Sequence, residues 1–341
     1  MKNISFRHAA AALAAALAVT ASATARADGV TLKFATTAPP GSHIAKFFEG
    51  WVDDFNKASP DVVKFRVYHS TLGNMNTIYD NVKNQVADVG WISPAMIPGK
   101  FKKTEFTRLP NLCDIAEFCS IAIWRVHQKG LFADEFDEVP AIAVHAYPPS
   151  VLNTDFPVKT VDDLKGRKIA VLGKEGAEIV SRLGATPISI GLFSFYQSIQ
   201  KGMVDGASIS YTAFYPFKLQ EVLNYHFELN MGGSNAYIGV GRTTWEALPA
   251  DVRRVIHEQS GERFSRALGK FWDGVAQGTR SAVGKMPGHR VIEPTAADAA
   301  RVEKLLAPML DQWVAETPGA GAVINAFRVE YGALIKSKPM N

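Results

Sequence analysis

The chain has 341 residues, of which 47% are hydrophobic and 21% are charged, and its formal net charge is +4. The first 27 residues hold three of the 37 Lys and Arg and none of the 33 Asp and Glu, so the remainder has a net charge of +1. A nearly neutral chain without a basic run is not typical of nucleic-acid-binding proteins, and we expect no nucleic-acid partner. The length after residue 27 is sufficient for two domains.

The N-terminal segment has the three parts of a secretory signal peptide. Lys2 and Arg7 give a basic start, residues 9–19 are apolar, and Ala25-Arg26-Ala27 puts small residues at the −3 and −1 positions of a cleavage site. The apolar run is too short to span a membrane, which takes roughly 20 residues. We therefore expect residues 1–27 to be removed and the mature protein to be exported.

From residue 30 onward, two kinds of segment follow one another. In one kind apolar and polar residues alternate, as in strands, and in the other apolar residues recur at helical spacing. Strands are predicted at 30–35, 62–68, 87–92, 142–145, 151–154, 168–172, 187–190, 206–210 and 236–241. Helices are predicted at 44–55, 75–86, 118–129, 175–183, 195–201, 250–285, 296–317 and 319–336. This alternation predicts an α/β fold with mostly parallel sheets that are flanked by helices.

The two cysteines, Cys113 and Cys119, precede and enter the helix predicted near residue 118. An oxidising compartment favours a disulfide between them. On one continuous helix they would be too far apart to bond, but Asp114 as N-cap with Glu117 at N3 would form a capping box whose turn brings them together. Two buried thiols are the alternative. No cluster of His or acidic residues completes a zinc site around them.

Ligands of α/β folds bind beyond the carboxyl ends of the strands, in crevices and at domain junctions. Many residues that follow the predicted strands are aromatic. Rings in a cleft can stack on a flat ligand or bind a cation on their faces. Packing in the hydrophobic core is the alternative role for each ring. The candidate ligand-binding residues are Thr37, His43, Trp91, Ser93, Tyr147, Ala170, Leu172, Ser189, Tyr211, Phe214, Tyr215 and Tyr237.

Motifs of the common enzyme classes are missing from the sequence. There is no G-x-S-x-G nucleophile turn, no P-loop, no H-E-x-x-H helix and no G-x-G-x-x-G after a strand. The spacing of the eight His residues predicts no metal site. We therefore expect a binding protein with no catalytic residues, no metal and no cofactor.

Several short motifs follow one another in a recognisable order. They are the loop Thr36–His43, Gln85–Gly90, Leu109-Pro110, Asp163–Ala170, Leu183–Pro187, Gly202–Gly206 and Trp245–Pro249. In this order, behind a signal peptide, they resemble the DctP-type solute-binding proteins of TRAP (tripartite ATP-independent periplasmic) transporters, and the resemblance covers nearly the whole mature chain.

The resemblance implies a periplasmic-binding-protein-like fold of two α/β domains, with a long helix that spans both and a ligand cleft between them. The first domain would comprise residues 28–148 and about 236–275, and the second 149–235 and about 276–341. The resemblance also implies hinge closure around one small organic ligand and delivery of that ligand to the TRAP membrane permease subunits. We expect a monomer, because a subunit that opens, closes and docks has reason to stay free.

The sequence departs from the family at the residue that usually binds the ligand's carboxylate. The family has Arg after "K-I", whereas Ala170 follows Lys168-Ile169 here. A methyl group cannot replace the bidentate bonds of a guanidinium. Three ligand classes stay open: an aromatic or neutral compound, a carboxylate held by Lys174 and the helix N-terminus that follows it, and a small organic cation. A secreted enzyme and a ligand-sensing subunit on the same fold are the alternative functions.

Overall fold

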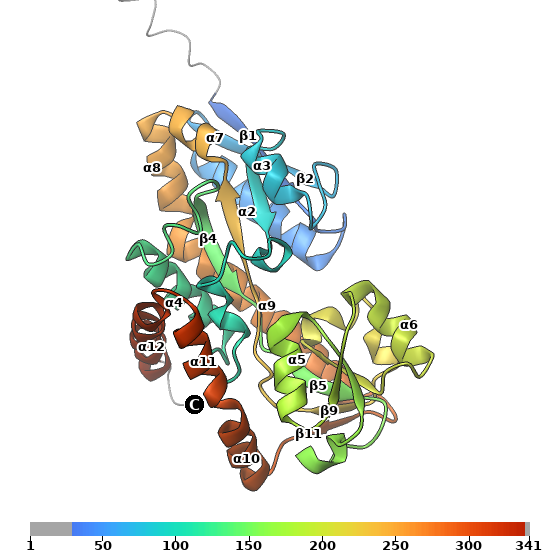
Figure 1. Cartoon of the computed structure of the whole chain (residues 1–341). Helices are drawn as coiled ribbons and strands as arrows, with labels where there is room; N and C mark the ends of the chain where they lie inside the picture. The colour runs from blue at the N-terminus through green and yellow to red at the C-terminus, as the bar shows by residue number, and fades with distance from the viewer. Residues whose placement is uncertain (1–28, 338–341) are drawn as a thin grey trace, which may run out of the picture.

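The computed structural model describes residues 29–337, so the predicted signal peptide lies outside the described residues. Two mixed sheets form two domains, each covered by helices (Figure 1). The predicted α/β class, with two domains and a long helix shared by both, is confirmed. Among residues 29–337, no helix combines the length and the apolar character needed to cross a membrane.

The first sheet has the strand order β2-β1-β3-β10-β4. Its β1 pairs in parallel with β2 and β3, whereas β10 runs antiparallel to β3 and β4. Alternate residues of β1 face the two sides, so that Leu32 and Phe34 are buried against α2 while Ala35 joins the core on the opposite face. The strands are β1 (Val30–Thr36), β2 (Val63–His69), β3 (Val89–Ile92), β4 (Ala141–Ala146) and β10 (Asn235–Val240).

The second sheet has the order β11-β9-β5-β8-β6-β7, and only β5 opposes its neighbours. The chain enters this sheet through β5 and leaves it after β9 to form β10, so the antiparallel strand of each sheet is the one that follows a crossing between domains. The strands are β5 (Val151–Thr154), β6 (Lys168–Val171), β7 (Thr186–Ser189), β8 (Gly206–Ile209), β9 (Tyr225–Phe227) and β11 (Arg290–Ile292).

The helices pack on both faces of the sheets, and short 3-10 turns, η1 to η6, follow several strands. The helices are α2 (His43–Ala58), α3 (Ile78–Lys83), α4 (Ala116–Gln128), α5 (Gly173–Arg182), α6 (Phe195–Gln200), α7 (Arg242–Ala247), α8 (Ala250–Gln259), α9 (Gly261–Val283), α10 (Ala296–Leu306), α11 (Pro308–Glu316) and α12 (Ala320–Ser337). The turns are η1 (Pro94–Met96), η2 (Thr104–Arg108), η3 (Val161–Leu164), η4 (Leu192–Ser194), η5 (Tyr211–Ala213) and η6 (Leu219–Glu221).

Two long helices predicted from the sequence are each divided in the structure. The 250–285 segment breaks into α8 and α9 at Ser260, because Gly261 takes a left-handed φ of +55° that a continuous helix does not contain. The 296–317 segment breaks into α10 and α11 before Pro308, whose ring and missing N–H are tolerated only in the first turn of a helix. Pro308 therefore begins α11.

Helix α9 belongs to both domains (Figure 1). Phe264 and Leu268 near its start are buried in the core beside the first sheet, and α9 also packs on α4 and β4. Val283 at its end is buried in the core of the second domain, where α9 packs on η5 and β11. The prediction that one long helix spans both domains is therefore confirmed.

The C-terminal helix α12 does not follow the expected assignment of residues 276–341 to the second domain. It packs on α4 beside the first sheet (Figure 1). Phe327 contacts Phe106 with a centroid distance of 4.7 Å, and the Tyr331 hydroxyl accepts hydrogen bonds from the N–H groups of Asp114 and Ile115 at 3.0 and 3.2 Å. The apolar face of α12 is thus buried against the first domain, which overrides its position in the sequence.

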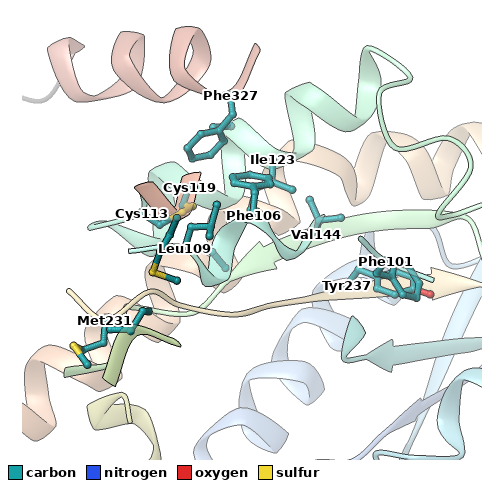
Figure 2. Close-up of a cluster of buried hydrophobic side chains, with 14 of the residues drawn as sticks. Phe101, Phe106, Leu109, Cys113, Cys119, Ile123, Val144, Met231, Tyr237 and Phe327 are labelled. Carbon is teal, nitrogen blue, oxygen red and sulfur yellow. A yellow bond between two sulfur atoms is a disulfide. The ribbon is translucent and has the colours of Figure 1, made fainter. Parts of the chain in front are cut away.

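One buried apolar cluster runs from the first domain into the second. Figure 2 shows part of it, from Phe327 and Phe106 through Leu109 to Met231. The disulfide Cys113–Cys119 lies at its edge and confirms the predicted pairing, with a Cα–Cα distance of 5.7 Å. Shared apolar burial of this kind holds the two domains together in addition to the chain crossings between them.

The N-terminus of α4 is capped differently from the predicted capping box. Asp273 of α9 accepts hydrogen bonds from the N–H groups of Ala116 and Glu117 at 2.9 and 2.8 Å. Its carboxylate also opposes the positive end of the helix dipole. The Asp114–Glu117 box is therefore wrong, because α4 begins at Ala116, after Ile115, and a residue distant in sequence supplies the cap.

Candidate functional site

Four rings meet at the carboxyl end of the first sheet. We call Trp91, His145, Tyr147 and Trp272 the aromatic cluster. Trp272 of α9 lies 4.8 Å from Tyr147 and 6.4 Å from Trp91, measured between ring centroids, and His145 lies 4.9 Å from Tyr147. Trp91 and Tyr147 come from the ends of β3 and β4 and are half-buried, so each keeps an accessible edge.

A hydrogen bond fixes the orientation of the cluster. The Trp91 indole N–H donates to Nε2 of His145 at 3.0 Å, so that nitrogen carries no proton. His145 is fully buried, and burial lowers its pKa to about 3. Burial likewise raises the pKa of Tyr147. The cluster therefore stays uncharged near neutral pH and offers flat, weakly polar surface, which suits an aromatic ring.

The predicted ligand residues of the second domain lie in two environments. Leu172, Ser189 and Tyr215 are exposed at the ends of β6, β7 and η5. Nearby Phe193 is 81% exposed and rests edge-on against Phe217, with a centroid distance of 5.4 Å. This edge of the second domain thus presents apolar side chains to solvent.

Tyr211 is buried, and its hydroxyl is already engaged. It donates to Oε1 of Glu228 at 2.8 Å, and Arg280 of α9 donates through Nε to the same carboxylate at 2.8 and 2.9 Å. Burial and the neighbouring Glu228 charge raise the pKa of Tyr211. Tyr211 therefore ties the second sheet to α9, and its hydroxyl is not free for a ligand in this conformation.

Three predicted ligand residues lie in packed cores, contrary to expectation. Ala170 and Phe214 are fully buried in the core of the second domain, because their sides of β6 and η5 face α6 and α9. Tyr237 is 1% exposed, and its ring lies 5.5 Å from Phe101 and 4.9 Å from Phe136 (Figure 2). These three residues fill interior space, so we leave them out of the site.

The remaining predicted residues come from loops of the first domain. Thr37 follows β1, Ser93 precedes η1, and His43 is exposed at the first residue of α2. Their side chains make no hydrogen bond to another residue in the range 29–337, so they keep their polar groups available. Their part in ligand binding stays a prediction.

Arg108, which was not predicted from the sequence, reaches from the first domain to the second. Its Nη2 donates to the Leu172 carbonyl at 3.1 Å, and its Nε lies 2.9 Å from the Glu175 carboxylate. Gly173 has a φ of +73°, and a Cβ there would collide with the guanidinium. A glycine after β6 therefore makes room for Arg108 beside the strand end where the family's Arg is missing.

Backbone contacts place the segment of Arg108 beside that of Tyr147. The Gly233 N–H donates to the Thr107 carbonyl and the Tyr147 N–H to the Ser234 carbonyl, both at 2.9 Å. Gly232, with a φ of +77°, lies against the Arg108 carbonyl, where a Cβ would collide. The glycine pair therefore holds the segments of Arg108 and Tyr147 side by side at the domain junction.

Lys174, the anchor considered from the sequence, is less well placed. Its side chain is 74% exposed, and its ammonium lies 3.6 Å from Glu316 of α11. Arg108 is only 14% exposed and lies between the domains. A partly desolvated guanidinium binds a carboxylate more strongly than an exposed ammonium does. Among residues 29–337, no group of three or more His, Cys, Asp or Glu side chains could hold a metal ion.

The comparisons with known proteins agree with this architecture. A TRAP solute-binding protein from Rhodoferax ferrireducens T118, solved with copurified benzoate, is 26% identical, with a TM-score of 0.80 over 90% of this chain and 99% of that one. A TRAP periplasmic solute-binding protein from Bordetella bronchiseptica, solved with bound (R)- and (S)-mandelate, is 25% identical, with a TM-score of 0.79 over 89% and 99%.

Sequence relatives and the family model extend the agreement over the chain. A solute-binding protein of Chromohalobacter salexigens is 25% identical over 337 residues, which cover 93% of this chain and 94% of the relative. The model of bacterial extracellular solute-binding proteins, family 7 (DctP), matches residues 34–317. This chain, with its two domains and its aromatic cluster at their junction, is accordingly a member of that family, the DctP-type solute-binding proteins of TRAP transporters.

Proposed function

We propose that this protein captures a small aromatic carboxylate between its two domains in the periplasm and delivers it to the membrane subunits of a TRAP transporter. The observation that carries the proposal is the position of Arg108, whose guanidinium reaches the strand end after β6 while its backbone segment lies beside that of Tyr147. Together Arg108 and the aromatic cluster can bind both halves of such a ligand: the aromatic cluster stacks on its ring, and the guanidinium pairs with its carboxylate.

The guanidinium keeps donors free for a ligand. Its Nε lies 2.9 Å from the Glu175 carboxylate, and one N–H of Nη2 is donated to the Leu172 carbonyl. A guanidinium has five N–H donors in a planar fork, and no described residue accepts a bond from Nη1. The Nη1–Nη2 edge can therefore take a carboxylate in bidentate geometry while Nε stays with Glu175.

The ligands of relatives support the aromatic assignment. Copurified benzoate was found in the Rhodoferax protein and mandelate in the Bordetella protein, and both compounds join one aromatic ring to one carboxylate. The aromatic cluster stays uncharged, and its Trp91 and Tyr147 are half-buried, so they offer stacking surface without a charge that would attract an amine. This reading combines the aromatic ligand first considered with the alternative carboxylate anchor.

Ligand capture would close the cleft. Leu172, Ser189 and Tyr215 face solvent on the second domain, and a ligand held by the first domain would draw them inward. A ligand that contacts both domains binds the closed form better than the open one, which shifts the population toward closure. The permease subunits can then distinguish loaded from empty protein, and a monomer leaves both domains free to dock.

Calorimetric titration with four compounds of similar size tests the proposal. We expect benzoate to bind, benzamide to bind at least ten-fold more weakly because it lacks the charge, and benzylamine not to bind. Cyclohexanecarboxylate should bind more weakly than benzoate because its ring does not stack. Binding of benzylamine in preference to benzoate, or binding of none of the four, would refute the proposal.

The same samples separate transport binding from the alternative functions. Benzoate recovered chemically unchanged after prolonged incubation would support a binding protein, whereas conversion to a product would indicate an enzyme. Small-angle scattering should give a smaller radius of gyration with saturating benzoate, and sedimentation should give the mass of one chain in both states.

A further inference from the structure

A second hollow lies on the outer side of the first domain, between α2 and the junction of α8 with α9. It encloses about 510 Å³, within the range of roughly 300 to 1,000 Å³ that small-molecule pockets occupy. We call it the outer groove. Its lining residues are Lys46, Phe47, Gly50, Trp51, Asp54, Phe55, Ala58, Gln259, Arg263, Phe264 and Ala267.

The floor of the outer groove is aromatic. Trp51 stacks on Phe264 with a centroid distance of 3.9 Å and an interplanar angle of 7°, and Phe47 lies 4.7 Å from Phe271 farther along α9. Since Phe47 meets the later residue of α9 and Trp51 the earlier one, the two helices run in opposite directions. Trp51 and Phe47 are half-buried, so part of each ring forms accessible surface.

The walls of the groove follow the four-residue spacing of helix faces. Lys46, Gly50 and Asp54 form one row on α2, and the opposite wall carries Arg263. Apart from its chain neighbours and its own helix backbone, a Cβ at Gly50 would meet no heavy atom within 4 Å, so this position is a notch in the wall of the groove. A flat molecule entering through the notch would lie on an aromatic floor.

The charged groups on the rim are free to pair with a ligand. The side chains of Lys46, Arg263 and Asp54 make no ion pair or hydrogen bond with any residue that the structure describes, which is unusual for groups around one hollow. Two cations and one acid leave a net charge of +1. Lys46 and Asp54 are eight residues apart on α2, or about 12 Å along its axis, so the acid stands away from the Lys46 end.

We propose that the outer groove is a second binding site, for a monoanionic planar aromatic compound. Its ring would lie against Trp51 beside the notch at Gly50, and its anionic group would pair with Arg263, with Lys46 farther along the groove adding positive charge. Asp54 disfavours a second negative charge on the ligand by like-charge repulsion. The site lies outside the cleft between the domains and is independent of the ligand bound there.

Titration with 2-naphthoate in the presence of saturating benzoate tests the proposal, since benzoate occupies the cleft. We expect one site per chain for 2-naphthoate, with quenching of tryptophan fluorescence, and weaker binding of the neutral 2-naphthol. Gly50→Leu fills the notch and should weaken 2-naphthoate binding at least ten-fold, and Arg263→Gln should weaken it about three- to ten-fold. Gly332→Leu, at another open helical glycine in α12, is the matched control and should leave it unchanged.

Three results would overturn the proposal. The first is no binding of 2-naphthoate to the benzoate-saturated protein at millimolar concentration. The second is binding that Gly50→Leu leaves intact. The third is a wild-type dimer that Gly50→Leu dissociates without any 2-naphthoate binding, which would make the groove a contact between copies. Benzoate binding in the cleft should be the same in all variants, so failure here is distinct from failure of the proposed function.

Discussion

Replacing Arg108 by Gln removes the proposed carboxylate anchor while keeping a polar side chain of similar length. Hydrogen bonds to charged groups contribute about 1.5 to 3 kcal/mol. Since 1.4 kcal/mol corresponds to a tenfold change in affinity, Arg108→Gln should raise the Kd for benzoate roughly 10- to 150-fold. The upper end is expected, because the variant also leaves the Glu175 carboxylate, 20% exposed, without its partner and near the ligand.

Glu175 supplies the internal test of this reasoning. In the ligand-free protein Glu175 pairs with Arg108 at 2.9 Å and partly neutralises it. Glu175→Gln should therefore tighten benzoate binding about three- to ten-fold, since the guanidinium then lacks a competing carboxylate. In the double variant the gain should disappear, because without Arg108 the competition no longer matters.

Isothermal titration with benzoate at pH 7 measures all four proteins of this cycle. Arg254→Gln is the control, because Arg254 pairs with Glu258 on the exposed face of α8. It should bind as the wild type does. If Arg108→Gln binds benzoate within twofold of the wild type, Arg108 is not the anchor. A large loss in Lys174→Gln would instead transfer that role to the helix N-terminus after β6.

Three further outcomes follow from the contacts described. Tyr211→Phe should lower the free energy of unfolding by about 1 kcal/mol, since Glu228 keeps Arg280 as partner, and should leave the benzoate Kd unchanged; a tenfold loss of affinity would return the hydroxyl to the ligand site. Replacing Cys113 and Cys119 by Ser should cost roughly 2 kcal/mol in urea unfolding, from the entropy of the short loop, and an unchanged midpoint would contradict this. The free energy of unfolding should fall between pH 7 and 5 by about 2 kcal/mol for each of His127, His145 and His226, because the unfolded chain binds more protons than the native one over this range. A free energy from urea unfolding that does not change with pH would refute this. Burial lowers these pKa values to about 3 or 4 in His127, His145 and His226.

Local pattern predicted the fold class and nine of the eleven strands that the structure describes, but it missed the three-residue strands β9 and β11. It failed where a helix ends for reasons outside the periodicity. The break at Gly261 depends on a left-handed backbone conformation. The break before Pro308 separates two helices that share one apolar pattern. Pro308 was a readable signal, since proline inside a helical pattern marks a boundary. The cap that Asp273 gives to α4 had no local signal at all.

The site was predicted in part for the same reason. Trp91 lies near the end of β3 and Tyr147 follows β4, and both strands run antiparallel to β10 between them, which puts the two rings at one edge of the sheet. Trp272 lies on a helix with a strong apolar face, so nothing in its spacing distinguishes it from core. Arg108 reaches the second domain only because Gly173 and Gly232 leave room for it. Such placement depends on long-range packing, which a single sequence does not reveal.

Because α9 contributes side chains to the interiors of both domains, neither domain has a complete hydrophobic core without it. Phe264 is removed from water by the first domain and Val283 by the second, yet both lie on one continuous helix. Melting either half would strip α9 of about half its tertiary support, and a lone helix is marginal in water. The energetic unit of this protein is therefore the whole chain: it should lose structure in one calorimetric transition, with equal van't Hoff and calorimetric enthalpies, although the proposed ligand would bind between the two domains.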